Sequence, residues 1–197
     1  VIDLLSKFVS EYSNWVKSQT EHKDANSQVG SQVILELEKT LERLNESLLL
    51  LANNEALFRA FQYANTAMLI QFSLDSSFYK EVQNIDLDKS IPNLSESQKN
   101  SSYRPFQLAF LLISIESVIN TNSKYRNESV DLIWFPTGGG KTEAYLAVAA
   151  ITILWRRMSY TDYSGVSVIM RYTLRLLTAQ QFERASKLIT VLEYLRQ

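Results

Sequence analysis

The chain has 197 residues, of which 46% are hydrophobic and 21% charged, and it contains no cysteine and a single histidine. This length supports a sizeable hydrophobic core, and the composition excludes wholesale disorder, a disulfide framework, Cys-ligated zinc and a histidine-rich metal site. No apolar run reaches the roughly 18 residues of a membrane helix, and Asp3 follows Val1 and Ile2 at once, so no signal peptide is expected. We therefore expect a cytoplasmic protein without a membrane partner.

The charge is unevenly divided along the chain. Residues 1–100 hold 9 basic and 14 acidic residues, whereas residues 101–197 hold 11 basic and 7 acidic residues. The acidic half is a poor surface for nucleic acid, and the basic half could provide one. Two ordinary surfaces of opposite sign would give the same contrast, so charge alone leaves both interpretations open.

The first half of the chain has the spacing of amphipathic helices. Apolar residues recur at steps of three and four in residues 2–15, 34–51 and 57–72. The middle stretch follows a heptad that is too short for a coiled coil, so we predict a helix packed in a bundle. Asn53 and Asn54 are expected to end that helix and to cap the next. The heptad residues are Ile34, Leu37, Leu41, Leu44, Leu48 and Leu51.

A polar segment separates the two halves. Residues 75–102 are rich in Ser and Asn and include Pro92, with room for one short helix at 78–82. This composition is typical of a domain boundary, which we place near residue 100. The prediction is a helical N-terminal region at 1–100, with no assigned role, and a second domain at 101–197.

The second domain is predicted to begin a parallel sheet. In chain order we expect a helix at 105–119, a loop at 120–128, a strand at 130–135, a helix at 142–158, a strand at 166–171 and a helix at 176–195. Strand, helix and strand at this spacing form a βαβ unit. The predicted fold class is therefore α/β, with a helical N-terminal region followed by an incomplete parallel sheet.

A phosphate-binding loop is predicted between the first strand and its helix. Glycines allow the backbone to wrap around a phosphate, and the following helix presents its positive end. In this pattern Lys141 reaches the β- and γ-phosphates, and the hydroxyl of Thr142 ligates Mg²⁺. The segment reads Phe135-Pro136-Thr137-Gly138-Gly139-Gly140-Lys141-Thr142.

The loop departs from the general pattern at one position. Phe135 stands where a glycine usually opens the motif. A plain glycine-rich turn with an exposed Lys141 is the alternative interpretation. Three consecutive glycines are costly in conformational entropy, however, and the chain has only five glycines, which favours the phosphate loop.

The loop resembles the first motif of superfamily 2 helicases, Pro-Thr-Gly-x-Gly-Lys-Thr. The resemblance implies that ATP and Mg²⁺ are bound by Thr137, Gly138, Gly139, Gly140, Lys141 and Thr142, with Lys141 and Thr142 as catalytic residues and Thr142 on the metal. The segment Arg104-Pro105-Phe106-Gln107 is similar to the family's upstream adenine-reading segment, because Gln107 lies 34 residues before Lys141. An amide can donate to and accept from adenine together. A polar glutamine on a surface helix is the alternative.

A third segment resembles the family's nucleic-acid motif, Pro-x-Arg-x-Leu-x-x-Gln. It runs from Thr173 to Gln180, with Arg175, Leu177 and Gln180 matching and Thr173 in place of the usual proline. The resemblance implies contacts from Thr173, Arg175 and Gln180 to the backbone of a single strand, which we expect to be DNA. A solvated arginine at the start of an amphipathic helix is the alternative.

The amino-acid sequence around these motifs, across residues 101–197, resembles that of the large helicase-like proteins of bacterial phage-defence systems, most nearly the DISARM type and next the Druantia type. The resemblance implies the start of a RecA-like motor lobe in an ATP-dependent DNA helicase or translocase, with protein partners in a defence complex. The family's later Asp-Glu box does not occur in these residues, so we expect this fragment to bind ATP without hydrolysing it. The alternatives are another P-loop enzyme, such as a kinase or GTPase, and a helical interaction module with a degenerate loop.

Overall fold

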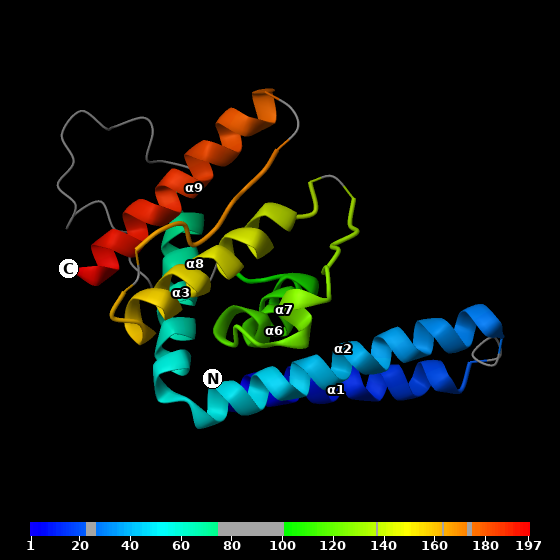
Figure 1. The fold of residues 1–197 in the computed structure, drawn as a ribbon. Helices are drawn as coiled ribbons and strands as arrows, with labels where there is room; N and C mark the ends of the chain where they lie inside the picture. Colours follow the sequence, from blue (N-terminus) through cyan, green and yellow to red (C-terminus); the bar gives the residue numbers. More distant parts are fainter. Residues whose placement is uncertain (23–26, 75–100, 137, 163, 173–174) are drawn as a thin grey trace. The chain divides into compact units, whose positions relative to one another are not determined.

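The computed structural model describes residues 1–22, 27–74, 101–136, 138–162, 164–172 and 175–197, and their regular structure is helical (Figure 1). The helices are α1 (Ile2–Thr20), α2 (Gln28–Asn53), α3 (Glu55–Leu74), α6 (Pro105–Ile119), α7 (Lys124–Asn127), α8 (Lys141–Ser159) and α9 (Arg175–Arg196). These residues divide into two compact units. The first unit contains Val1–Phe58 and Ala109–Leu132, and the second contains Arg59–Leu108 and Ile133–Gln197.

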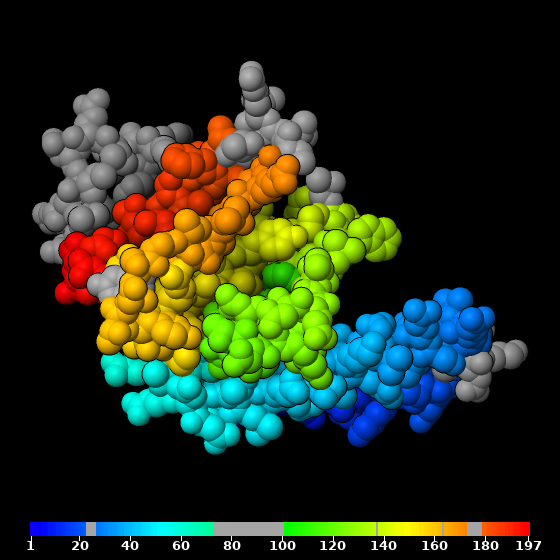
Figure 2. All heavy atoms as spheres, viewed as in Figure 1, coloured from blue at the N-terminus to red at the C-terminus, as the bar shows by residue number. Residues whose placement is uncertain are grey.

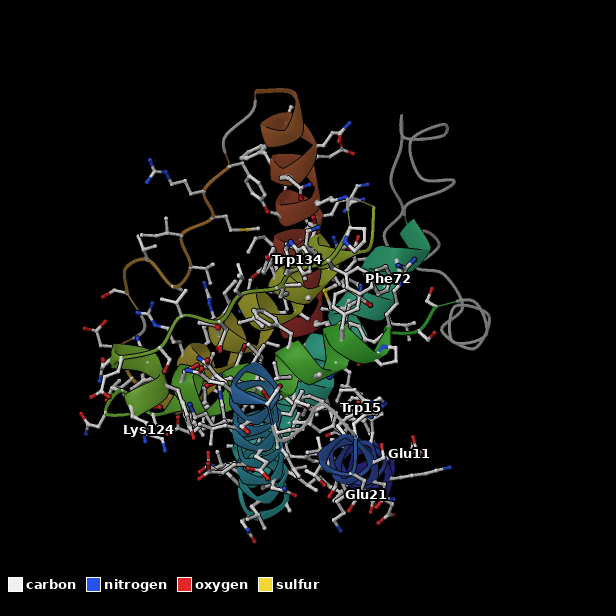
Figure 3. The ribbon with its side chains drawn as sticks, turned by 90° about the vertical axis from the view of Figure 1, so that its right-hand side faces the viewer. Glu11, Trp15, Glu21, Phe72, Lys124 and Trp134 are labelled. Carbon is white, nitrogen blue, oxygen red and sulfur yellow. The ribbon has the colours of Figure 1, made fainter. Side chains whose placement is uncertain are left out.

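The predicted α/β fold is wrong, because the described part of the chain contains no strand and no sheet. Residues 130–135 and 166–171, which were expected to be buried parallel strands, are extended but unpaired. Several of their apolar side chains lie in solvent: Trp134, labelled in Figure 3, is 93% exposed, and Ile169 is 86% exposed. These segments are rich in β-branched and aromatic residues, which is the composition of a strand. A sheet also requires a neighbouring strand, and these segments have none among the described residues.

An arginine side chain, rather than a partner strand, holds the second of these extended segments. The guanidinium of Arg156 donates to the carbonyl oxygens of Ser164 and Val166 at 2.9 and 2.7 Å, and to the hydroxyl of Ser167 at 3.0 Å. The segment with these residues lies on the surface of the second unit (orange in Figure 2). A side chain that satisfies the backbone oxygens in this way replaces the hydrogen bonds of a sheet ladder.

The helical predictions are confirmed. Helices α1, α2 and α3 contain the three amphipathic stretches, and α6, α8 and α9 contain the helices that were expected in the second half. The side-chain oxygen of Asn54 accepts the backbone N–H of Leu57 at 3.0 Å, which caps α3 as the sequence predicted. Within the loop expected at 120–128, the side chain of Ser123 caps the short helix α7.

The core of the first unit lies between the antiparallel helices α1 and α2 and under α6 (Figure 1). Leu44 and Leu51 of the heptad are fully buried, as expected for a helix in a bundle. The hydroxyl of Ser47 donates to the carbonyl oxygen of Leu112 at 2.6 Å. This bond satisfies a polar group that is otherwise enclosed by leucines.

Arg43 of α2 joins three parts of the first unit. Its guanidinium binds both carboxylate oxygens of Asp131, at 2.5 and 2.8 Å, and donates to the carbonyl oxygen of Ile113 at 2.7 Å. It also lies 4.5 Å from the ring centroid of Tyr125. The hydrogen bond to Asp131 is the largest cause of the raised pKa of Arg43. This network fixes the beginning of the first extended segment on α2 and α6.

The second unit is built on α3, α8 and α9. Small residues of α8 allow close packing: Ala144, Ala147 and Ala150 are fully buried, together with Ile151. Helix α8 packs on α9, whose Leu188 is also buried. Burial of α8 on more than one side agrees with its nearly continuous apolar surface.

Two sequence predictions fall outside the described residues. The short helix at 78–82 and the boundary near residue 100 lie in or beside residues 75–100, which the structure does not describe. The boundary therefore stays a prediction. Each compact unit draws residues from both sides of position 100. Among the described helices, none has the length and apolar character needed to cross a membrane.

Candidate phosphate-binding loop

The predicted phosphate loop precedes α8 directly, and its glycines adopt conformations that other residues avoid. Gly138 has φ of 79° and Gly140 has φ of 86°, both in the left-handed region. Gly140 is also the N-cap of α8, so the loop ends where the helix exposes its first N–H groups. The backbone therefore requires glycine at two of the three positions.

Gly139, the middle glycine, is required for a different reason. A side chain at this position would collide with the ring of Phe135, and at Gly140 it would meet the side-chain amide of Gln107 at 2.5 Å. The N–H of Gly139 donates to the carbonyl oxygen of Pro136 at 3.1 Å and closes a tight turn. The turn therefore has no room for a side chain at Gly139 or at Gly140.

Lys141 folds back over the start of the loop. Its ammonium group donates to the carbonyl oxygens of Phe135 at 2.5 Å and Pro136 at 3.2 Å. The side chain is only partly buried, so solvent and small anions can reach it. A cation held by two neutral carbonyl groups keeps its full charge available for a phosphate, which is a stronger acceptor than a carbonyl.

Two residues of the upstream segment contact the loop directly. The buried side chain of Gln107 donates through Nε2 to the carbonyl oxygen of Gly140 at 2.7 Å, and its Oε1 accepts the N–H of Arg104 at 2.7 Å. The guanidinium of Arg104 donates to the carbonyl oxygen of Gly139 at 3.1 Å. The structure therefore brings together the two predicted segments, which are more than thirty residues apart in the sequence.

An aromatic contact accounts for the unusual residue at the start of the loop. The rings of Phe135 and Phe106 are stacked, with centroids 4.3 Å apart and an interplanar angle of 19°. From the sequence, Phe135 is only a departure from the motif, and Phe106 has no evident role. The sequence signal for this contact was Phe106, the aromatic residue directly before Gln107. The same short segment thus holds the loop by hydrogen bonds and by ring packing.

Tyr103 attaches the upstream segment that begins at Arg104 to helix α3. Its ring packs edge-on against Phe72 of α3, labelled in Figure 3, with centroids 6.4 Å apart. Burial raises the pKa of the Tyr103 hydroxyl, which has no hydrogen-bond partner among the described residues. The contact fixes the chain immediately before Arg104, so the position of the upstream segment depends on α3.

The first turn of α8 carries Thr142 and Glu143. Thr142, the residue predicted to contact the metal, is partly exposed. One carboxylate oxygen of Glu143 forms an ion pair with Arg184 of α9 at 2.9 Å. The sequence gave no sign of this pair, because its residues are far apart in the chain and belong to no motif.

Not every predicted site residue can be placed. Thr137 and Thr173 lie outside the described residues. Arg175 begins α9, and Gln180 is exposed on the same helix. The predicted nucleotide residues that the structure brings together are Arg104, Gln107, Gly138, Gly139, Gly140, Lys141 and Thr142. Of the predicted nucleic-acid segment, it shows only that the residues from Arg175 onward begin helix α9.

The chain is similar to the DISARM protein DrmA of Bacillus paralicheniformis, with 38% identity over 204 residues. The similarity covers the whole chain, including the helices of the first half, and 18% of that protein. The chain thus spans about a fifth of the length of this relative. No protein-family model matches the chain.

Proposed function

We propose that residues 136–142 bind the phosphates of ATP, and that the chain is the nucleotide-binding part of a helicase-like or translocase motor that acts in phage defence. The observation that carries this proposal is the pair of hydrogen bonds from Gln107 and Arg104 to the carbonyl groups of the loop. These bonds join the adenine-reading and phosphate-binding segments that the family resemblance predicts. The similarity to a DISARM protein supports the defence role.

The geometry suits an anion at the start of α8. Gly140 ends the loop at the N-terminus of the helix, where unpaired N–H groups and the helix dipole favour negative charge. Lys141 adds a full positive charge, and among the described residues its ammonium group is held by backbone carbonyls. When phosphate binds, its oxygens would replace these carbonyl oxygens as acceptors of the hydrogen bonds from the ammonium group.

Gln107 retains the capacity to read a base. A side-chain amide can form four hydrogen bonds, and Gln107 uses one donor and one acceptor within the protein. The second N–H and the second lone pair can serve adenine. We therefore expect ATP to bind more tightly than GTP, whose base edge presents the opposite pattern of donors and acceptors.

Magnesium fits the same site. Thr142 is partly exposed and follows Lys141 directly, and Mg²⁺ prefers oxygen ligands such as a hydroxyl together with phosphates. When bound, the ion would neutralise charge on the β- and γ-phosphates. The residues of this chain would position the nucleotide, and we expect hydrolysis to need residues outside this chain.

Nucleic acid is the proposed second ligand. Thr173, Arg175 and Gln180 are proposed to contact the backbone of a single DNA strand, as the family resemblance implies. The substitution Arg175→Ala in the intact protein should then weaken binding to all strands about equally and reduce the salt slope of log K by roughly 0.7. An unchanged affinity with an unchanged slope would remove this part of the proposal.

Nucleotide titrations of the intact protein test the proposal as a whole. Preference for ATP over GTP supports the helicase-like motor. Preference for GTP would favour a different P-loop enzyme, and the absence of binding to either nucleotide would favour a helical interaction module in which the loop is degenerate. Binding should be measured with and without Mg²⁺, since the metal is expected to tighten triphosphate binding.

A further inference from the structure

Glu143 places a negative charge beside the phosphate loop. It is the third residue of α8, directly after Lys141 and Thr142. Its Oε2 atom is shielded from solvent and accepts no hydrogen bond from any described residue. A Cβ atom built on Gly140 would lie 3.4 Å from this oxygen, so the carboxylate faces the last glycine of the loop.

This charge opposes the ligand that the loop is proposed to bind. Like charges close together in a partly buried environment repel each other more strongly than they do in water. A lone carboxylate at this place would therefore weaken the binding of phosphates, and each additional phosphate charge would increase the effect. A negative charge in the first turn favours an empty helix N-terminus but competes with a bound anion there.

Arg184 supplies the compensating charge. Its guanidinium lies 2.9 Å from Oε1 of Glu143, whose side chain is 19% exposed. The backbone around Arg184 is itself fixed, because its carbonyl oxygen accepts a hydrogen bond at 3.2 Å from the buried side chain of Gln71 on α3. The cation is thus held beside Glu143 by the packing of α9 against α3 and α8.

We propose that Arg184 is a positioning residue of the nucleotide site, which neutralises Glu143 so that the loop can accept a polyphosphate. This inference rests on the proposed function. It makes α9 a determinant of nucleotide affinity, and it predicts that affinity depends on Arg184 in proportion to the charge of the ligand. A purely structural pair that only joins α8 to α9 would instead affect all ligands equally.

Three ligands of increasing charge separate these two roles. In the intact protein, Arg184→Ala should weaken ATP binding roughly tenfold and ADP binding by about threefold, while adenosine binding stays unchanged. The matched control is Arg196→Ala, which removes an arginine of α9 that is paired with Glu193 on the same helix at 2.6 and 2.8 Å. This control should leave the affinity for all three ligands unchanged.

Two further variants keep the test decisive if Arg184→Ala folds poorly. Glu143→Gln should bind ATP at least as tightly as the wild type, because the repelling charge is gone. Arg184→Lys should restore most of the ATP affinity, since it keeps the cation. Equal losses of ATP and adenosine in Arg184→Ala, or no loss of ATP, would overturn the inference while leaving the proposed function intact. A wild-type protein that binds no ATP would overturn both.

Discussion

The side-chain amide of Gln107 donates to the carbonyl oxygen of Gly140 at 2.7 Å, so the residue predicted to read adenine also holds the phosphate loop. Removing the amide would leave a loop carbonyl without its buried donor. An unsatisfied buried polar group costs about 1–3 kcal/mol. If the proposed function holds, Gln107 has two separate contributions to nucleotide binding, one through the loop and one through the base.

Replacement of Gln107 separates these contributions. Gln107→Ala should weaken both ATP and GTP because the loop loses a hydrogen bond, and it should weaken ATP further because adenine loses its partner. Isothermal titration with both nucleotides measures the difference. Equal losses for the two nucleotides would mean that Gln107 only holds the loop.

The glycines of the loop should tolerate substitution unequally. Gly139→Ala pushes a methyl group into the ring of Phe135 and should destabilise the protein by about 1–3 kcal/mol. In Gly138→Ala nothing lies within 4 Å of the new Cβ, and only the left-handed backbone adds a cost of about 1–2 kcal/mol. Chemical denaturation measures both effects.

A compensating change identifies the cause. If the ring of Phe135 is the obstacle, adding Gly139→Ala to a Phe135→Ala background should cost less stability than adding it to the wild type. Gly138→Ala should cost the same stability in both backgrounds, because its new Cβ meets no atom within 4 Å. An equal cost of Gly139→Ala in both backgrounds would show that the stacked phenylalanines do not restrict the middle glycine.

The sequence was sufficient for the helices and for selecting two segments that the structure brings into contact at the glycine loop. Helical periodicity is a local property, and the loop and Gln107 were recognisable from residue types and spacing. The extended segments were misassigned because a strand depends on a neighbour, and unpaired residues such as Trp134 have the composition of strands. The contacts of Arg43 with Asp131 and of Arg184 with Glu143 join distant residues without a motif, so no pattern in the sequence pointed to them.

The ion pair between Arg43 and Asp131 should contribute strongly to the stability of the first unit. The side chain of Arg43 is 11% exposed and that of Asp131 is 24% exposed. Arg43→Ala strands a shielded carboxylate and should cost about 3 kcal/mol. Lys39→Ala, which breaks an exposed pair with Glu36 on the same helix, should cost less than about 1 kcal/mol. Thermal unfolding of both variants tests the contrast, and equal costs would contradict it.

Arg156 should protect the second extended segment. Its guanidinium is bonded to three oxygens between Ser164 and Ser167. In Arg156→Ala, limited proteolysis should cut within residues 164–169 faster, while the buried turns of α8 stay protected. An unaltered cleavage rate in the segment would mean that the arginine does not hold it.

The central claim is that the glycine loop and Lys141 bind the phosphates of ATP, and an ATP titration of the intact protein with two lysine variants tests it most directly. Lys141→Ala should lose most of the ATP affinity with little change in thermal stability, because the hydrogen bonds of its ammonium group to described residues go to backbone carbonyls of a surface loop. Lys39→Ala, which removes an exposed lysine of α2, should bind ATP as the wild type does. Equal ATP affinity in wild type and Lys141→Ala would contradict the claim.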